Sequence, residues 1–547
     1  MDAGRAYTSD PSPQAGSPPA PPAGDDAART AGRGGAAVAG AKLYFLLIGL
    51  VQKTLLPQTW VLGVEGYGAL ARVLTIVNVA NNVVTGTCIQ GASRAVAQAP
   101  PGGRRGVERG LWRLHAALAL PLGLLVALLG PLAARLTGGA HVAGLVRASA
   151  LIVFAYALYA PVVGVLNGRR SFGRQAALDV TYATMRTLAL VGGALLVGRL
   201  GGSRPAGALG GFVLAAALIV PLSFAAARVG PGGAGAAAPG GAAGAPGGRL
   251  ETKPYLAFLA PLALGQLFLN ALMQADIWLL GRFSDRAAVD AGLAGAEAIA
   301  ASDRSVAIYN ACQLFSFLPY QLLFAITFIL FPMLAKAHAD GDREAVARYV
   351  RTGVRLAGVL AGAMVAVTFG LAPQLLRLVF PPAISDHGGE ALRLLALGQG
   401  AFALFGVQTT VLSSVHRERW TLVLNGAATL VVAGLNLLLV PGAAVGAPIA
   451  ERTALATALA MALAVAAGGA AVVRATGALV RPLAALRVLA AFALAAFVGT
   501  RLPQGGKALT VASAALVGLV YAAALVATRE LGPGDLALVR RVLGRRG

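Results

Sequence analysis

Apolar stretches of about 20 residues recur along the chain between residues 41 and 528, separated by short polar segments. An α-helix rises 1.5 Å per residue, so about 20 residues cross a hydrocarbon core of roughly 30 Å. The sequence therefore predicts an all-α polytopic membrane protein. About fourteen transmembrane helices are expected, at 41–62, 69–92, 114–134, 148–167, 176–198, 206–227, 254–281, 305–334, 354–376, 394–412, 421–440, 453–473, 483–500 and 508–528.

Composition supports this class and excludes an ordinary soluble enzyme. Hydrophobic residues make up 57% of the 547 residues and charged residues only 12%, against about 25% charged in soluble chains. The net charge of +23 is distributed unevenly: alternate connections and the C-terminal tail hold 25 Lys or Arg, with Arg355 at the edge of its helix included, and the opposite connections hold 12. Because basic residues in short loops stay on the cytoplasmic side, the sequence predicts a cytoplasmic-membrane protein with both termini in the cytoplasm.

Two low-complexity segments divide the chain. Residues 1–35 predict a disordered cytoplasmic tail, and the Gly/Ala/Pro segment at 229–250 predicts a flexible linker. Similar basic motifs recur in both halves, with Arg113 and Arg351 at an offset of 238, as in transporters built from internal repeats. We therefore expect an N-terminal six-helix bundle (36–228), a C-terminal six-helix bundle (251–475), accessory helices 13 and 14 (476–528) and a basic cytoplasmic tail (529–547).

Several motifs resemble a known superfamily. DIWLLGRF (Asp276–Phe283), IYNACQ (Ile308–Gln313) and LPYQLLFAITFILFP (Leu318–Pro332) are similar to helices 7 and 8 of the multidrug/oligosaccharidyl-lipid/polysaccharide (MOP) exporters, and EGYGALARV (Glu65–Val73) and NGRRSFGRQ (Asn167–Gln175) to landmarks of the first half. Within this superfamily the chain resembles the polysaccharide and lipid-linked oligosaccharide flippases. The resemblance implies two bundles in an inverted V and alternating access. The Arg-rich opening of helix 1 associated with lipid II flippases is absent.

Charged and polar residues inside apolar stretches identify a candidate substrate site. A charge near mid-bilayer costs roughly 2.5 to 3.5 kcal/mol on insertion scales and usually faces a partner or a wet cavity. Lys53 is expected roughly 18 Å along the first helix, and Arg72 lies near the start of the second; snorkelling is the alternative for both. Asn78 and Asn82 continue a polar stripe from Arg72, which indicates either a cavity wall or interhelical hydrogen bonding.

Helices 7 and 8 carry similar polar faces. Asp276 lies about 80° from the helix 7 face, so pairing with a neighbouring helix or with Arg282 is its alternative. Asp179 and Arg186 on helix 5 are interpreted as a structural pair. The predicted substrate-binding residues are Lys53, Arg72, Asn78, Asn82, Gln266, Asn270, Gln274, Asp276, Tyr309, Gln313 and Tyr320.

Hydrolytic and transfer motifs are missing from the sequence. The five histidines are scattered, the two cysteines lie in apolar stretches, and neither a phosphate-binding loop nor a metal-ligand spacing occurs. We expect no enzyme activity, no cofactor, no metal and no nucleic-acid partner. Uphill transport would then depend on a coupling ion (H⁺ or Na⁺), on the membrane potential, or on consumption of the product.

The leading functional hypothesis is a flippase for a polyprenyl-pyrophosphate-linked oligosaccharide or polysaccharide precursor, with membrane lipids as further partners. A drug/cation antiporter of the same superfamily is the alternative, and it should carry carboxylates in its cavity. A membrane saccharide ligase or polymerase would need a large outer loop, whereas the longest one expected here is 282–304. A scaffold without transport would leave the polar faces unexplained.

Overall fold

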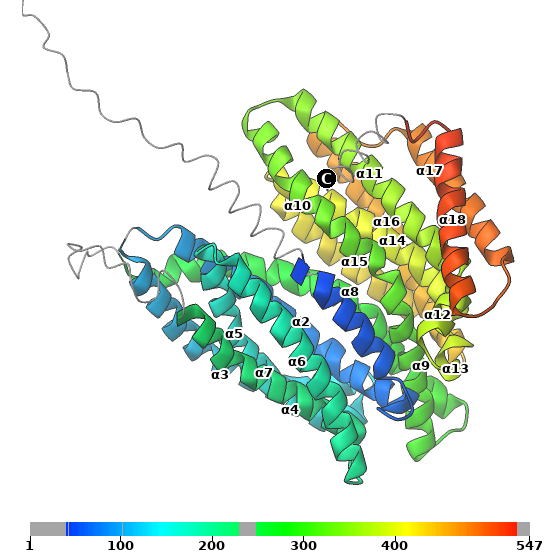
Figure 1. Cartoon of the computed structure of the whole chain (residues 1–547), viewed down its shortest axis with the longest axis horizontal. Coiled ribbons are helices and arrows are strands. Elements are labelled where there is room, and N and C mark those ends of the chain that lie inside the picture. Colours follow the sequence, from blue (N-terminus) through cyan, green and yellow to red (C-terminus); the bar gives the residue numbers. More distant parts are fainter. Residues whose placement is uncertain (1–39, 42, 101, 229–247, 533–547) are drawn as a thin grey trace, which may run out of the picture.

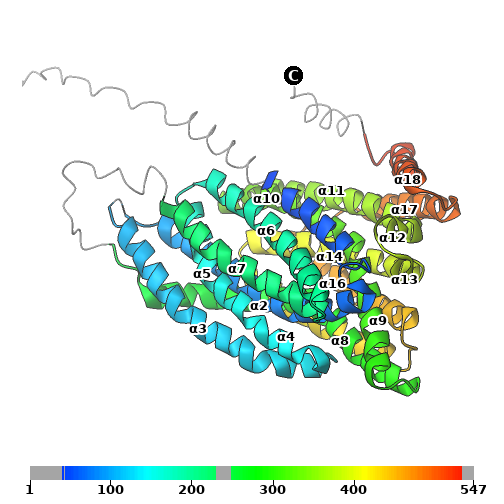
Figure 2. The same cartoon turned by 60° about the horizontal axis from the view of Figure 1, so that its bottom comes forward.

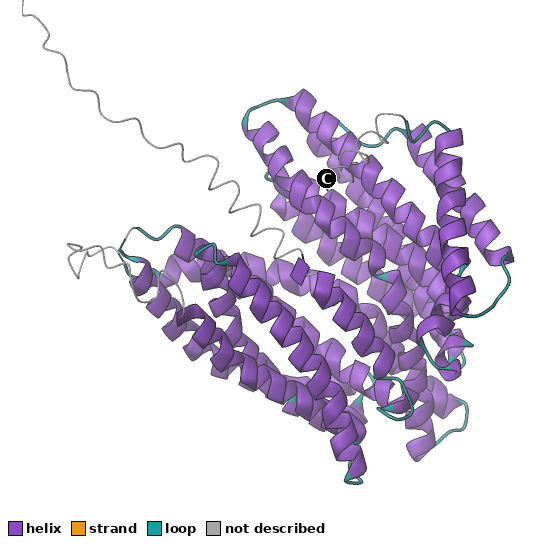
Figure 3. Cartoon of the chain, in the orientation of Figure 1, coloured by secondary structure: helices purple, strands orange, loops and turns teal. Residues whose placement is uncertain are grey.

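The computed structural model describes residues 40–41, 43–100, 102–228 and 248–532. Within these ranges the chain is helical and contains no strand (Figure 3). The tail predicted at 1–35, most of the predicted linker and most of the basic tail lie outside the described residues. The prediction of an all-α membrane protein is confirmed, because twelve described helices are long and apolar enough to span a bilayer.

The first half is a bundle centred on α5, which packs against α2, α3 and α7. Small residues allow close approach between its helices: a Cβ on Gly211 of α7 would lie 1.8 Å from the carbonyl oxygen of Ala189 on α6. After a first apolar helix, Leu43–Leu55, the elements are α2 (Gly63–Ala97), α3 (Arg104–Leu136), η1 (Ala140–Val142), α4 (Ala143–Ala148), α5 (Ala150–Gly168), α6 (Phe172–Arg199) and α7 (Arg204–Arg228).

The second half is built around α14, which packs against α10, α11 and α16. The accessory helices α17 and α18 pack on α11 at the side of this bundle (Figure 1). The elements are α8 (Thr252–Asp290), α9 (Gly295–Ser316), α10 (Leu318–Ala339), α11 (Arg343–Gly370), α12 (Ala372–Val379), α13 (Pro382–Ser385), α14 (Gly389–Ser414), α15 (Glu418–Leu439), α16 (Ala447–Thr476), α17 (Pro482–Arg501) and α18 (Lys507–Ala527).

The two bundles diverge from one end of the molecule in the shape of a V (Figure 1), and Figure 2 shows the same two groups of helices from a second direction. Helix α2 joins them, because it packs against both α8 and α9 of the second half. Contact is closest where the V converges: a Cβ on Gly68 of α2 would lie 1.9 Å from the carbonyl oxygen of Asp303 on α9. The expected pair of bundles with two accessory helices is present; the domain boundaries stay predictions.

The exact count of about fourteen spans is not confirmed, and two predicted helices account for the difference. In place of 41–62, the described helix Leu43–Leu55 is short; it ends two residues before Pro57, which cannot donate a backbone hydrogen bond. The predicted helix 305–334 is divided into α9 and α10 at Phe317. Pro319 in the first turn of α10 removes a backbone donor at this point.

The long outer loop expected at 282–304 is wrong. Helix α8 continues nine residues past the apolar stretch to Asp290, and α9 already begins at Gly295. The extension RFSDRAAVD has no proline or glycine to end it, and the helix stops only before Gly292, which has a φ of +78°. Little irregular chain is therefore present here.

Candidate functional site

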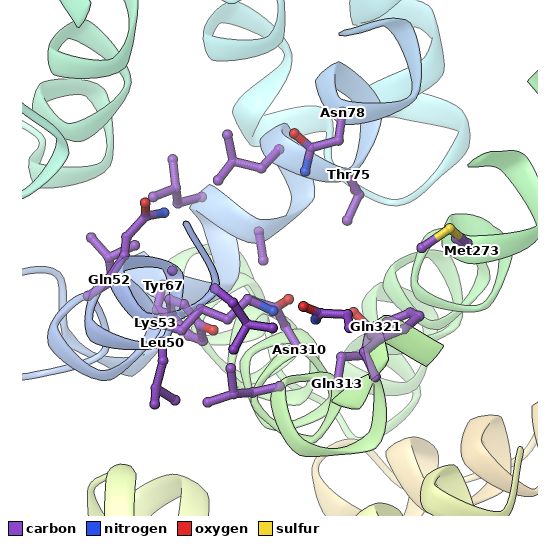
Figure 4. Close-up of a pocket in the computed structure, with 18 of the residues that line it drawn as sticks. Leu50, Gln52, Lys53, Tyr67, Thr75, Asn78, Met273, Asn310, Gln313 and Gln321 are labelled. Atoms are coloured by element: carbon purple, nitrogen blue, oxygen red, sulfur yellow. The ribbon is translucent and has the colours of Figure 1, made fainter. Parts of the chain in front are cut away.

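A cavity of about 560 Å³ lies between the two bundles. Its walls come from helix Leu43–Leu55, α2, α6 and α7 of the first half and from α8, α9 and α10 of the second. Figure 4 shows Gln52, Lys53 and Tyr67 on one side of this space and Asn310, Gln313 and Gln321 on another. Both halves therefore supply polar side chains to one site.

Two cations line the cavity, Lys53 and Arg186. Neither forms an ion pair with a described residue. The Arg186 guanidinium lies 5.0 Å from the ring centroid of Phe45 and 5.9 Å from that of Tyr182, and its Nε is buried without a hydrogen-bond partner in the described chain. Among the described residues that line the cavity there is no Asp or Glu. The charge facing this space is therefore positive.

Amide and hydroxyl groups surround the two cations. The cavity is lined by Gln52, Thr75, Asn78, Gln274, Asn310, Gln313 and Gln321. Tyr67 Oη and Gln313 Nε2 are buried and have no hydrogen-bond partner among the described residues. Buried polar atoms normally have a protein or water partner, so these atoms and Arg186 Nε are available to a polar ligand or to water. Aromatic and aliphatic side chains form the rest of the wall.

The structure brings five of the eleven predicted site residues to this cavity: Lys53, Asn78, Gln274, Gln313 and Tyr320. Lys53 is in the last turn of its helix, two residues from the end at Leu55, rather than in the middle of a long span as expected. Its position still directs it to the cavity (Figure 4). Tyr320 packs against Phe402, with ring centroids 4.7 Å apart, so the Phe402 ring supports the Tyr320 side of the cavity wall.

Three predicted residues instead form the seam between α2 and α8. Asn82 Nδ2 donates to Asn270 Oδ1 at 2.7 Å, and Asn270 Nδ2 donates to the carbonyl oxygen of Gln266 at 2.8 Å. A Cβ on Gly86 would lie 3.1 Å from the Gln266 side chain, so the two helices are tightly packed there. The polar stripe of α2 thus lines the cavity at Asn78 and joins the two halves at Asn82.

Arg72 is the centre of an ion-pair network rather than part of the cavity wall. Its Nε donates to Asp303 Oδ1 at 2.7 Å, and its other nitrogens donate to Asp285 (3.0 Å), Ser302 (2.6 Å) and the carbonyl oxygen of Gly138 (2.6 Å). His141 Nε2 lies 3.0 Å from Asp303 Oδ2. We call these six residues the Arg72 network. Because α2 and the α3–η1 turn contact α8 and α9 through it, the network ties the bundles together where the V converges.

Asp276 is enclosed within the second half. Its Oδ2 accepts a hydrogen bond from Tyr309 Oη at 2.6 Å, and its Oδ1 accepts from the backbone N–H of Ile277 at 2.7 Å. Tyr309 Oη also lies 3.5 Å from Thr457 Oγ1 on α16. Both Asp276 and Tyr309 are buried and neither lines the cavity. They form a separate polar pair between α8 and α9.

The sequence analysis missed four residues that line the cavity: Arg186, Gln52, Asn310 and Gln321. Arg186 carried the same signal as Lys53, a cation inside an apolar stretch, and the spacing to Asp179 favoured a structural reading instead. The three amides are close in sequence to polar residues that were identified. Their spacing along the helices does not distinguish them from residues that face lipid.

Comparisons with known proteins agree with this architecture. Residues 298–438 match the MatE family model. "Lipid II flippase MurJ, inward closed conformation" matches with a TM-score of 0.68 and 13% identity, over 90% of this chain and 99% of that chain. An inward-facing MATE family multidrug resistance transporter of the MOP superfamily matches with a TM-score of 0.59 and 15% identity, over 79% of this chain and 96% of its own.

A third similar structure is a MOP superfamily transporter from Pyrococcus furiosus, described as having a binding pocket of reverse polarity that suggests a different function. It has a TM-score of 0.51 and 15% identity, over 80% of this chain and 95% of its own. No curated protein matches the chain in sequence. At these identities the structural likeness establishes the fold. The MatE match and the shared fold together confirm that the chain resembles the MOP superfamily.

Proposed function

We propose that this chain is a flippase that moves a polyprenyl-pyrophosphate-linked oligosaccharide or polysaccharide precursor across the cytoplasmic membrane. The observation that carries the proposal is the cavity charge: in the described part of the chain, Lys53 and Arg186 face the cavity without ion-pair partners and no carboxylate lines it. Charge-assisted hydrogen bonds from such cations suit a pyrophosphate. The surrounding amides, Gln52, Asn310 and Gln313 among them, can bond the hydroxyl groups of a sugar.

Alternating access supplies the transport step. The bundles meet through the Arg72 network at one end and diverge at the other, so the cavity is separated from one side of the membrane. The distribution of basic residues favours an orientation with the converging end of the V outside and both termini in the cytoplasm. Opening this end would require the four contacts of the network that join the halves, Arg72 with Asp303, Asp285 and Ser302 and His141 with Asp303, to exchange partners while the other end closes.

The antiporter alternative rests on Asp276, which is the type of residue that binds H⁺, Na⁺ or a cationic drug. This carboxylate is enclosed by Tyr309 and α16 and does not reach the cavity. We therefore assign the cavity to an anionic substrate and leave Asp276 as the candidate for a coupling ion. A ligase or polymerase is disfavoured further because the stretch at 282–304, where its outer loop would be sought, is mostly helical.

Reversing the cavity charge tests this function. Lys53→Glu and Arg186→Glu should each abolish translocation of a fluorescent polyprenyl-pyrophosphate saccharide in proteoliposomes, because each places a carboxylate against the pyrophosphate. Lys53→Arg should partly retain activity, since it keeps the charge and binds phosphate well. The amount of protein in the membrane, measured by immunoblot, should not change.

Arg199→Glu is the control: Arg199 is an exposed arginine at the end of α6 and does not line the cavity, so translocation should be normal. Normal translocation by Lys53→Glu and Arg186→Glu would overturn the anionic substrate and favour the antiporter.

A further inference from the structure

A second hollow, of about 420 Å³, lies at the converging end of the V, outside the central cavity. The ends of α3 and α8 form it, and it is lined by Arg135 and Gly138 from the first half and by Arg282, Asp285, Arg286 and Asp290 from the second. None of the predicted site residues lines it. Gly138 and Asp285 also belong to the Arg72 network, so the hollow adjoins the contact that holds the bundles together.

The charge of this hollow is unbalanced. Arg135, Arg282 and Arg286 are exposed, and none of the three side chains forms a hydrogen bond or ion pair within the described chain. Asp285, by contrast, already accepts from Arg72 at 3.0 Å and from Ser302 at 2.6 Å. Three guanidinium groups therefore face the space against two carboxylates, and one of these, Asp285, is already held by Arg72, so the described lining carries a net positive charge. Guanidinium groups are well suited to bind phosphate oxygens bidentately.

The depth of the hollow indicates where its ligand comes from. Arg135 is the second-last residue of α3. In α8, Arg282 comes directly after the apolar segment, which ends at Gly281. Both arginines therefore lie where an apolar helix reaches the polar boundary of the bilayer, at the level of the lipid headgroups. On α3, Leu128, Leu132 and Leu136 are exposed at intervals of four residues, so an apolar face suited to acyl chains leads up to Arg135.

We propose that this hollow binds the headgroup phosphate of an anionic membrane lipid, and that the bound lipid bridges the two bundles. Arg135 would hold the phosphate from the first half, and Arg282 and Arg286 from the second. The C-terminal end of α3 stabilises Arg135 rather than an anion, so the arginine side chains supply the binding. A phosphate held across the two halves stabilises the state in which the Arg72 network is closed.

The test uses the full chain in nanodiscs of phosphatidylcholine, alone or with phosphatidylglycerol. Phosphatidylglycerol should raise the Tm of the wild-type chain, and native mass spectrometry should show the lipid retained. Each arginine replaced should weaken phosphatidylglycerol binding about fivefold, so that Arg135→Gln/Arg282→Gln/Arg286→Gln abolishes the shift. Arg199→Gln, an exposed arginine outside the hollow, is the matched control and should behave as wild type.

The bridge is tested by changing one half at a time. Arg135→Gln alone and Arg282→Gln/Arg286→Gln alone should each reduce the Tm shift; an effect confined to the α8 arginines would overturn the bridge. An unchanged shift in the triple variant would overturn the site. An equal shift from inorganic phosphate in phosphatidylcholine nanodiscs would overturn the assignment to a lipid. Each result is independent of translocation by the Lys53 cavity.

Discussion

Cations inside this chain occupy two different environments. Lys53 and Arg186 line a cavity whose described residues include no carboxylate, whereas Arg72 donates to two carboxylates, a hydroxyl and a carbonyl group in a buried network. A charge within a membrane protein needs either water or a partner. The first two are therefore suited to bind a ligand, and the third is suited to hold helices together.

This distinction predicts different outcomes for Arg72 and Lys53. Arg72→Gln removes the guanidinium from the buried Asp303 carboxylate and leaves only the His141 contact at Oδ2. Removing one partner of a buried ion pair costs about 3 to 5 kcal/mol. We expect a lower Tm and less folded protein, measured by fluorescence-detected size-exclusion chromatography after heating. Lys53→Gln breaks no ion pair and should keep the wild-type Tm; an unchanged Tm for Arg72→Gln would contradict the network's role.

The sequence identifies residues of this kind but not their partners. Their depth within apolar stretches identified Lys53, Arg72 and Asp276 as unusual. In the structure Lys53 lines the cavity, and Arg72 and Asp276 have buried hydrogen-bond partners. Whether such a residue lines a cavity depends on helices more than 200 residues away, such as the α9 segment that brings Asp303 to Arg72. Similarly, Tyr309 donates a hydrogen bond to Asp276, which lies outside the cavity. Contacts of this kind leave no local pattern in the sequence.

Among the elements, α2 has the central position because it contacts helices of both bundles. Glycines allow this: Gly68 lies against the backbone of Asp303, and Gly91 lies against Leu259 and Tyr255 of α8. Two helices can approach this closely in a membrane only where a small residue faces the neighbour. The seam along α2 is therefore sensitive to added volume at these positions.

Gly68→Ala should accordingly open the converging end of the V. The new Cβ would lie 1.9 Å from the Asp303 carbonyl oxygen, so α2 and α9 must separate and lengthen the Arg72–Asp303 ion pair. We expect a lower Tm and faster hydrogen exchange at residues 295–316. Gly265→Ala in α8 is the control, since a Cβ there meets no atom within 4 Å; it should gain up to about 1 kcal/mol of helix propensity. Equal behaviour of the two variants would contradict the close packing.

Helix boundaries were predictable where hydropathy alone determines them. The segments predicted at 421–440 and 483–500 correspond closely to α15 (Glu418–Leu439) and α17 (Pro482–Arg501). The prediction was wrong at 282–304, because α8 continues beyond the apolar stretch with Phe283, Ser284 and Ala288 buried against the rest of the protein. Packing and helix propensity, not hydropathy, determine the helix there. The division at Phe317 is caused by Pro319 in the first turn of α10. An average of hydropathy does not detect it, because one proline hardly changes the average of an apolar stretch.

At the scale of the whole molecule, the accessory helices are fixed to the second bundle. Arg355 of α11 and Arg487 of α17 both lie within ion-pair distance of Glu530, at 2.7 and 3.5 Å, and Tyr521 Oη donates to the carbonyl oxygen of Val359 at 2.9 Å. These contacts, together with the close approach of Gly370 and Gly499, couple α17 and α18 to α11. The accessory pair should therefore move with the second bundle.

The orientation of the whole molecule can be measured with single cysteines, because the two native ones, Cys88 and Cys312, are buried. Basic residues concentrate in alternate connections, which predicts that the converging end of the V faces outward. Ser203→Cys and Ala291→Cys, both exposed at that end, should react with a membrane-impermeant maleimide in intact cells. Asp340→Cys and Glu418→Cys, exposed at the opposite end, should react only after permeabilisation. The reverse pattern would invert the orientation, and the Arg72 network would then close the cytoplasmic side instead.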